Sequence, residues 1–206
     1  MSKSFYISGG NRYGESFVLQ RAGFIPALSL EAADIVVFTG GADINPAIYG
    51  ETAHPTTYFG NERDQREISD YKKAVEQGKA MLGICRGAQL LNCLAGGSLF
   101  QHIQHPGFHE IVTDDGERFM SNSVHHQMLR VGEGAIIKAW AEDLSPFHEH
   151  MLDGQIVNVE HVPREPEIVI YPERRMVLVQ GHPEFNANDE ELTRFREFVF
   201  NLLLEA

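Results

Sequence analysis

A single cysteine between two glycines is the feature of this sequence that most directly indicates chemistry. Cys85 follows the apolar run 80–84, and Gly83 and Gly87 stand two positions to either side of it. Glycines at this spacing permit a nucleophile elbow, the sharp strand-to-helix turn that lifts the central side chain clear. Free amides at the start of the following helix favour the thiolate, which is the reactive form of cysteine. Cys85 is therefore a candidate nucleophile; a buried cysteine that only packs is the alternative.

A histidine and a glutamate later in the chain are suited to activate such a nucleophile. His182 follows the apolar run 176–179, and Glu184 lies two positions further on. A thiol, an imidazole base and a carboxylate that fixes the imidazole tautomer form a triad for acyl transfer. The backbone N–H of Arg86 is placed where an oxyanion would form. The sequence thus predicts acyl transfer at Cys85, with His182 as the base and Glu184 as its orienting group.

The elements that must position these residues can be predicted from the pattern of apolar positions. Continuous apolar runs, typical of strands buried on both faces, alternate with amphipathic stretches of helical period. The predicted strands are 4–8, 34–39, 80–84, 156–159, 168–171 and 176–179, and the predicted helices are 15–22, 62–77, a segment starting at Cys85, and 189–204. Helices interleaved with buried strands imply a three-layer α/β sandwich.

Two regions between these elements predict other structure. Segment 44–62 contains two prolines and few helix formers, which indicates a long loop beside the glycine pair at 40–41. Short β-like runs at 98–103, 110–113, 122–131 and 135–140 predict hairpins or an extra mixed sheet. The charged residues of the helix predicted at 62–77 are expected to form a solvated face.

Composition limits the class of protein. With 206 residues, of which 43% are hydrophobic, and no linker, we expect a single domain over residues 1–206. The formal charge of −12, from 29 acidic and 17 basic residues without a basic cluster, argues against nucleic acid or an anionic membrane as a partner. No window reaches the roughly 18 consecutive apolar residues of a membrane helix, and the polar start differs from a signal peptide. A cytoplasmic location is the expectation.

The spacing of cysteines and histidines argues against a disulfide and a catalytic metal. On one helix Cys85 and Cys93 would lie about 12 Å apart, beyond the roughly 7 Å a disulfide tolerates. Cys93 is therefore predicted to be a core residue in a reducing compartment. Seven of the ten histidines lie between 102 and 150, but no His-Glu-x-x-His pair occurs. We therefore expect no metal and assign no metal ligand.

Several motifs taken together resemble a known family. The sequence resembles the class I glutamine amidotransferase domains at three places: Gly83-Ile-Cys85-Arg-Gly87-Ala-Gln89, Gly40-Gly41 after a strand, and Gln180-Gly-His182-Pro-Glu184. Further stretches resemble one branch of these domains, the γ-glutamyl hydrolases (peptidase C26), and especially the γ-glutamyl-γ-aminobutyrate hydrolases. These stretches are 40–51, 96–101, 122–127 and Arg63-Asp64-x-x-Glu67. The resemblance runs from about residue 35 to residue 184.

This resemblance implies a flavodoxin-like three-layer αβα sandwich with a mostly parallel central sheet and an extra β-hairpin insert. It also implies a Cys-His-Glu triad, a γ-glutamyl thioester on Cys85, and no cofactor. The oxyanion would be bound by the backbone amides of Gly41 and Arg86. The glutamyl end of a small-molecule substrate would be held by Gln89, His125, His126 and Gln127.

Three hypotheses for the function remain open at this point. The first is a free-standing hydrolase of γ-glutamyl amides that releases glutamate and an amine. The second is a glutaminase subunit that delivers ammonia to a separate synthetase or amidoligase. The third is an inactive binding module, against which the intact set of Cys85, His182 and Glu184 argues. The leaving amine and the oligomeric state, including a homodimer, are not fixed by the sequence.

Overall fold

A mixed nine-stranded sheet forms the centre of the molecule. The structure is a computed structural model that describes residues 2–9, 13–105, 107–142, 144–186, 189–190 and 192–206. In spatial order its strands are β2 (Ile25–Pro26), β1 (Ser4–Ile7), β3 (Ile35–Phe38), β4 (Ala80–Ile84), β14 (Met176–Val179), β13 (Glu165–Tyr171), β10 (Ile136–Ala141), β7 (Phe108–Thr113) and β8 (Arg118–Asn122). The helices are α1 (Tyr13–Arg21), α2 (Asn61–Glu76), α3 (Arg86–Leu94) and α4 (Thr193–Glu205), with 3₁₀ turns η1 (Pro46–Tyr49) and η2 (Pro172–Arg174).

The centre of the sheet is parallel and buried on both faces. Strands β2, β1, β3, β4 and β14 pair in parallel, with Val37 opposite Leu82 and Leu82 opposite Val177. Side chains alternate along a strand, so Ile35 and Val37 enter one core while Val36 and Phe38 enter the other. This double burial explains the continuous apolar runs in the sequence.

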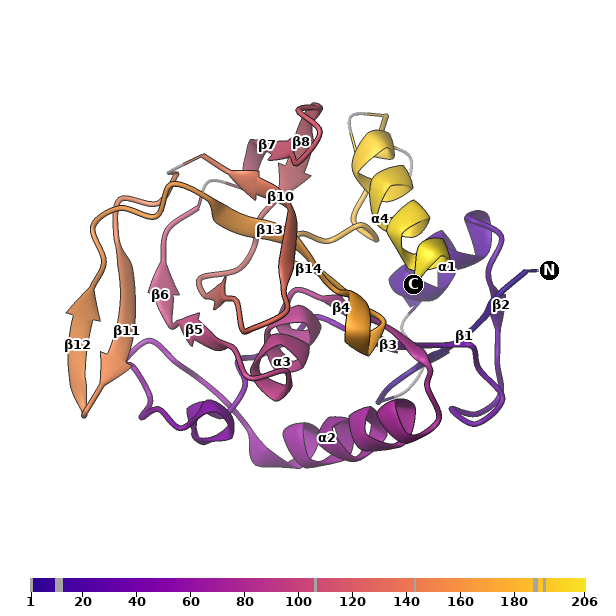
Figure 1. Ribbon diagram of the computed structural model, residues 1–206, viewed down its shortest axis with the longest axis horizontal. Coiled ribbons are helices and arrows are strands. Elements are labelled where there is room, and N and C mark those ends of the chain that lie inside the picture. The colour runs from indigo at the N-terminus through magenta and orange to yellow at the C-terminus, as the bar shows by residue number, and fades with distance from the viewer. Residues whose placement is uncertain (1, 10–12, 106, 143, 187–188, 191) are drawn as a thin grey trace.

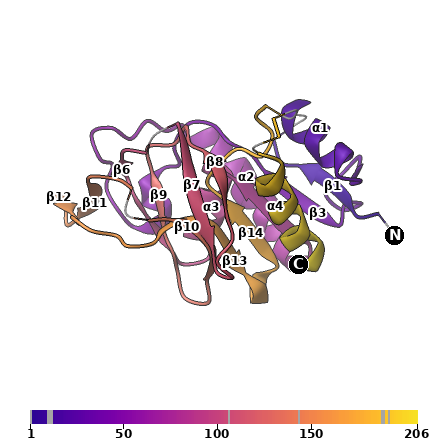
Figure 2. The same cartoon turned by 90° about the horizontal axis from the view of Figure 1, so that it is seen from above.

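Helices cover the two faces of the parallel strands (Figures 1 and 2). Helices α1 and α4 supply Leu19 and Phe195 to one core, and α2 and α3 supply Ala74 and Leu91 to the other. The arrangement confirms the predicted three-layer α/β sandwich. Cys85, at the junction of β4 and α3, therefore lies at the centre of the fold.

The second half of the sheet is antiparallel. Strands β13, β10, β7 and β8 extend it beyond β14, and each pairs antiparallel with its neighbour. The sheet is thus more mixed than the family resemblance implied, with parallel strands forming its core. Two smaller sheets contain β12 (Gln155–Asn158), β11 (His148–Leu152) and β6 (His102–Ile103), and β5 (Ser98–Phe100) with β9 (Met128–Arg130). The β11–β12 hairpin lies at the end of the molecule opposite the termini (Figure 1).

Several boundaries differ from the sequence prediction. The run 122–131 is not one strand, because β8 ends at Asn122 and β9 begins at Met128. Strands β8 and β11 were not predicted, since their polar and charged residues hide the alternation. Both cysteines are free, as predicted, and Cys93 is a core residue. In the described part of the chain, no helix is both long and apolar enough to cross a membrane.

Candidate active site

Cys85 occupies a backbone conformation that few side chains adopt. Its φ is 51° and its ψ is −110°, between the last residue of β4 and the first residue of α3. The turn is tight because both flanking glycines are in close contact: a Cβ on Gly83 would lie 2.7 Å from the backbone of Ala88, and one on Gly87 would overlap the carbonyl of Phe38. These contacts confirm the sequence prediction of an elbow at Cys85. The cysteine is 7% exposed.

His182 and Glu184 lie beside this cysteine in a common hydrogen-bonded arrangement. Nδ1 of His182 donates to Oε1 of Glu184 at 2.6 Å, which leaves Nε2 for proton transfer. Burial lowers the pKa of His182, but the Cys85 and Glu184 side chains raise it to about 10. The ring also stacks on Phe185, with 4.2 Å between centroids. The structure thus brings together the three residues that the sequence predicted as a triad; their catalytic roles stay a prediction.

The backbone around His182 is held by contacts that sequence analysis did not assign. Asn122 clamps it: its Oδ1 accepts the N–H of His182 at 2.7 Å and its Nδ2 donates to the carbonyl at 2.9 Å. Gly40 lies against the ring, since a Cβ there would come within 2.7 Å of His182 Cε1. Asn122 lies in the stretch 122–127 that resembles the γ-glutamyl hydrolases, but only the structure shows that it holds the backbone of His182.

The predicted oxyanion site is formed by two backbone segments. Arg86 begins α3, so its N–H has no partner within the helix. Gly41 has a φ of 150° and lies next to Arg86, whose Cδ would be 3.6 Å from a Cβ on Gly41. A glycine is needed there because a side chain would also overlap the guanidinium of Arg63. The two segments are close enough to act together, and their role as oxyanion donors stays a prediction.

A buried network of ion pairs fixes these two segments. The Arg86 guanidinium donates to Asp64 and Glu67, both buried on α2. Arg63 donates to Glu67 at 2.8 Å and, through its other nitrogens, to the carbonyls of Thr39 and Gly40 at 2.9 Å each. The expectation that the charges of this helix form a solvated face is therefore wrong for these residues. They face inward, where two cations and two carboxylates compensate one another.

The residues predicted to hold the glutamyl end do not all reach an open surface. Gln89 is buried and donates from Nε2 to the carbonyl of Gln127 at 3.3 Å. Gln127 is also buried and donates to Thr57 Oγ1 at 3.2 Å. The His125 side chain is 1% exposed and points at Glu167 in the interior, which argues against direct contact with a substrate. These three residues support the loop around the site; binding roles for Gln89 and Gln127 stay predictions.

His126 is the member of that segment that reaches the surface. Its side chain is 42% exposed, and Nε2 donates to the two carboxylate oxygens of Asp43 at 3.0 and 3.1 Å. Asp43 in turn accepts the N–H of Tyr58 at 2.9 Å, so the loop after the glycine pair folds back on itself. The predicted long loop and the β insert therefore meet beside Gly41.

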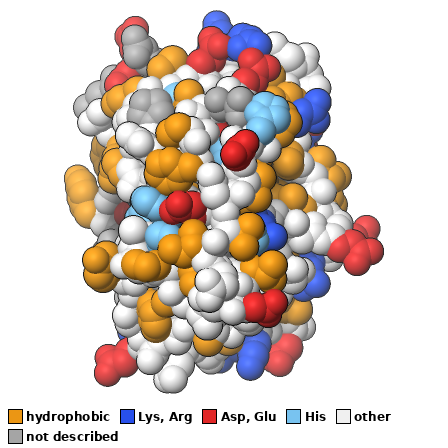
Figure 3. Space-filling view, turned by 90° about the vertical axis from the view of Figure 1, so that its left-hand side faces the viewer, with side chains coloured by type: hydrophobic (Ala, Val, Ile, Leu, Met, Phe, Trp, Pro, Cys, Tyr) orange, Lys and Arg blue, Asp and Glu red, His pale blue; other side chains and the backbone are white. Residues whose placement is uncertain are grey.

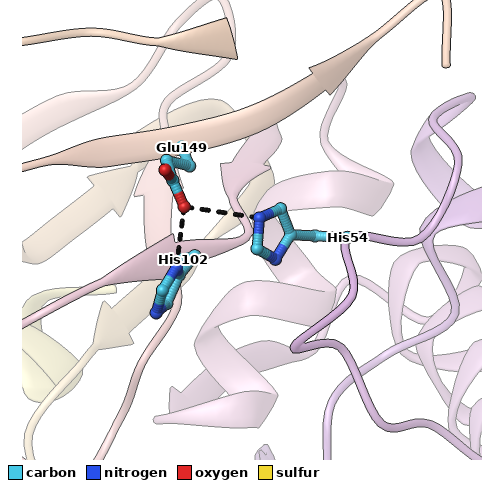
Figure 4. Close-up of side chains that lie close together, drawn as sticks. All are labelled: His54, His102 and Glu149. Carbon is cyan, nitrogen blue, oxygen red and sulfur yellow. Dashed lines mark hydrogen bonds and ion pairs between the residues drawn. The ribbon is translucent and has the colours of Figure 1, made fainter. Parts of the chain in front are cut away.

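A second contact ties the same loop to the insert. The carboxylate of Glu149, on β11, lies between the imidazoles of His54 and His102, at 3.3 and 2.7 Å (Figure 4). His54 belongs to the loop and His102 to β6. On this side of the molecule, histidine and acidic side chains lie together among hydrophobic ones (Figure 3). The loop and the insert are thus in contact at two separate places.

An elbow cysteine, a His-Glu pair and an α/β sandwich with a parallel core define the class I glutamine amidotransferase-like proteins. A solved glutamine amidotransferase from Thermotoga maritima has this fold, with a TM-score of 0.57 and 14% identity, covering 99% of this chain and 89% of that one. The chain belongs to the peptidase C26 family, which it matches over residues 25–153.

Curated relatives agree with this assignment. A glutamine amidotransferase-like protein of Lactococcus lactis subsp. lactis, YvdE, is 33% identical over 181 residues, covering 75% of this chain and 67% of its own. The γ-glutamyl-γ-aminobutyrate hydrolase of Escherichia coli O157:H7 is 26% identical over 164 residues, covering 74% of this chain and 64% of its own.

Proposed function

We propose that this protein hydrolyses γ-glutamyl amide bonds through a γ-glutamyl thioester on Cys85 and releases glutamate and an amine. The observation that carries the proposal is the elbow cysteine beside the hydrogen-bonded His182 and Glu184. A strained, largely buried cysteine next to an oriented imidazole suits nucleophilic attack better than packing. The resemblance to γ-glutamyl-γ-aminobutyrate hydrolases supplies the substrate class.

The proposed reaction needs only groups of this chain and water. Cys85 gives its thiol proton to His182 and its sulfur attacks the γ-carbonyl carbon, and the oxyanion is stabilised by the N–H groups of Gly41 and Arg86. The C–N bond then breaks, and the leaving amine takes that proton from His182. A water molecule gives a proton to His182 and attacks the thioester; the C–S bond breaks, glutamate is released, and His182 returns the proton to the sulfur of Cys85. Glu184 keeps the imidazole oriented throughout.

The architecture around the site favours a chain that acts without a partner. The loop bonded to Asp43 and the segment that contains His126 meet beside Gly41. A second contact, from Gln127 to Thr57, joins the same two parts. These intrachain contacts build a rim beside the site on which a small amide can rest. A subunit that delivers ammonia commonly needs its partner to complete such a site.

The test compares substrates on the purified chain. We expect hydrolysis of γ-glutamyl-γ-aminobutyrate and γ-glutamyl-p-nitroanilide, with kcat/KM above that for glutamine, measured as glutamate released. Cys85→Ala should lower the rate by roughly 10³-fold or more. Hydroxylamine should intercept the thioester and give γ-glutamyl hydroxamate with the wild type but not with the variant. A chain inactive on all three substrates would overturn the proposal.

Ammonia delivery is the second candidate, because YvdE is named for its likeness to glutamine amidotransferases. In that case glutamine would be the best substrate, and hydrolysis by the isolated chain would be weak. Activity that appears only with a co-expressed ligase would establish this alternative.

A further inference from the structure

A cluster of histidine and glutamate side chains, not used by the proposed reaction, is enclosed behind the active site. Its members are His105, His109, His125, His148, Glu165 and Glu167, each with a side chain no more than 2% exposed. The cluster is adjacent to the catalytic loop because the carbonyl of Glu167 accepts the N–H of Gln180, two residues before His182, at 2.8 Å. So many buried polar groups require partners.

Glu167 lies at the centre of this cluster, and among the described residues its carboxylate has no hydrogen-bond partner. Its Oε1 is 3.2 Å from His109 Nε2, 3.5 Å from His105 Nδ1 and 3.8 Å from His125 Nε2. These separations do not form hydrogen bonds, and in the described part of the chain neither carboxylate oxygen of Glu167 has a hydrogen-bond partner. Two ligand atoms bound to one tetrahedral zinc ion lie about 3.3 Å apart, given bonds of roughly 2.0 Å. The separations from Glu167 to His105 and His125 are slightly longer than this value, and one ligand atom from each of the three residues lies within 4.8 Å of the other two.

In two of the histidines, the hydrogen bond made by the ring nitrogen farther from Glu167 determines which ring nitrogen faces the Glu167 carboxylate. Nδ1 of His125 lies 2.9 Å from the carbonyl of Gln127, which can only accept, so this nitrogen carries the hydrogen. The other nitrogen of this ring, Nε2, therefore faces the carboxylate of Glu167, at 3.8 Å from its Oε1. Nε2 of His105 likewise bonds to Glu165 at 2.6 Å, with Nδ1 turned to Glu167. Metal-binding histidines are held by such outer hydrogen bonds.

We propose that His105 Nδ1, His125 Nε2 and the carboxylate of Glu167 bind one divalent transition-metal ion, with His109 Nε2 beside the same carboxylate. Imidazole and carboxylate ligands at these separations fit zinc best among common ions. The site is enclosed by protein and separate from Cys85, so its role is structural. It would join the segment after β6, the segment before β9 and strand β13.

A proton is the competing occupant. One proton on His105 Nδ1 gives Glu167 a single donor. It leaves the Nε2 lone pair of His125 facing the same carboxylate with no cation between them. A metal ion satisfies all three groups at once, which is why we favour it.

The histidine pair in Figure 4 is a weaker candidate for the same chemistry. Glu149 there already accepts a hydrogen bond from His102 at 2.7 Å, and both side chains are more than a quarter exposed. Water can therefore reach the His102 and Glu149 side chains, although that of His54 is buried. This difference makes His102→Ala a matched control that removes a histidine from a comparable cluster.

The test measures metal in tag-free protein, purified without added metal or chelator, by elemental analysis. We expect about one equivalent of zinc, or of another divalent first-row ion, per wild-type chain. Glu167→Gln and His125→Ala should each retain less than about a tenth of that amount. His102→Ala and Cys85→Ala should retain the wild-type amount, which excludes the surface pair and the nucleophile as the ligands.

A second measurement covers variants that fail to fold. Wild-type protein unfolded in chelator should refold with a higher thermal midpoint when equimolar Zn²⁺ is present than when it is absent. Substitution by Co²⁺ should give absorption bands of a tetrahedral nitrogen and oxygen site. A metal-free wild type whose midpoint is the same with Zn²⁺ and with chelator would overturn the proposal, whatever the enzyme activity. So would metal retained by Glu167→Gln.

Discussion

The two cysteines of this chain differ in backbone conformation and surroundings, although Cys85 directly precedes α3 and Cys93 lies within it. Cys85 is held at a φ of 51°, a conformation that costs about 1–3 kcal/mol and persists only where neighbours enforce it. Cys93 lies inside α3 among core residues, and burial raises the pKa of its thiol. The inert form therefore predominates at Cys93, and reactivity is expected at Cys85 alone.

Alkylation should make this difference visible. A γ-glutamyl-mimicking electrophile, such as a glutamine-derived chloroketone, should add once per chain, and peptide mass mapping should place it on Cys85. Modification of Cys93 in the folded protein should be at least roughly 10²-fold slower, because only the thiolate reacts and burial disfavours it. Labelling that survives in Cys85→Ala at the wild-type rate would contradict the assignment of the nucleophile.

At the scale of elements, helix α2 supports both the Cys85 elbow and the glycine pair after β3. Its Arg63 and Glu67 lie one turn apart and meet Arg86 of α3 and the carbonyls after β3. The helix thus joins the elbow to the glycine pair, and the relative position of these two segments depends on buried charges of α2 and α3. Removing one charge of a compensated set leaves its partner unpaired in the interior.

Glu67→Gln should therefore cost about 3 kcal/mol or more of unfolding free energy. It should also lower kcat more than it raises KM, since the Gly40–Gly41 segment loses its anchor. Urea unfolding and steady-state kinetics provide the two measurements. Glu76→Gln, on the exposed part of the same helix, is the matched control and should change stability by less than about 0.5 kcal/mol. Equal stability of the two variants would show that the network does not support the site.

For the whole molecule, the sequence predicted the parts that depend on local pattern. The buried strands β3, β4 and β14, the helices and the elbow at Cys85 follow from apolar runs, periodicity and glycine spacing. Strands β8 and β11 were not predicted because residues such as Arg118 and His148 interrupt the alternation of apolar and polar residues. Their placement depends on partners distant in sequence.

Contacts between distant segments were the least predictable. Nothing in the spacing of Asp64, Glu67 and Arg86 shows that a helix face rich in charge turns inward. The cluster around Glu167 draws its histidines from separate segments, whereas ligand patterns are recognised by short spacings. Cys85, His182 and Glu184 were predicted together because their residue types follow apolar runs at spacings suited to acyl transfer, and the support of His182 by Asn122 became visible only in three dimensions.

Stability of the whole molecule should depend on pH through His182. The pKa of His182 is about 10 in the folded chain and near 6.5 when unfolded. Because the folded value is raised, the contribution of this group is fully present below pH 6.5 and is lost as the pH rises through about 10. The folded chain binds the extra proton in this window, so the unfolding free energy should fall with rising pH.

The decline should be steeper in the wild type than in His182→Gln, because other titrating groups are common to both and cancel in the difference. Urea unfolding at pH 6, 8 and 10 measures it. Glu184→Gln should give an intermediate slope, since it removes one of the two groups that raise the pKa of His182 while Cys85 remains. Parallel stability curves for the wild type and His182→Gln would mean that the imidazole does not hold its proton in the folded state. In that case the proposed donor of a proton to the leaving amine would have to be a different group.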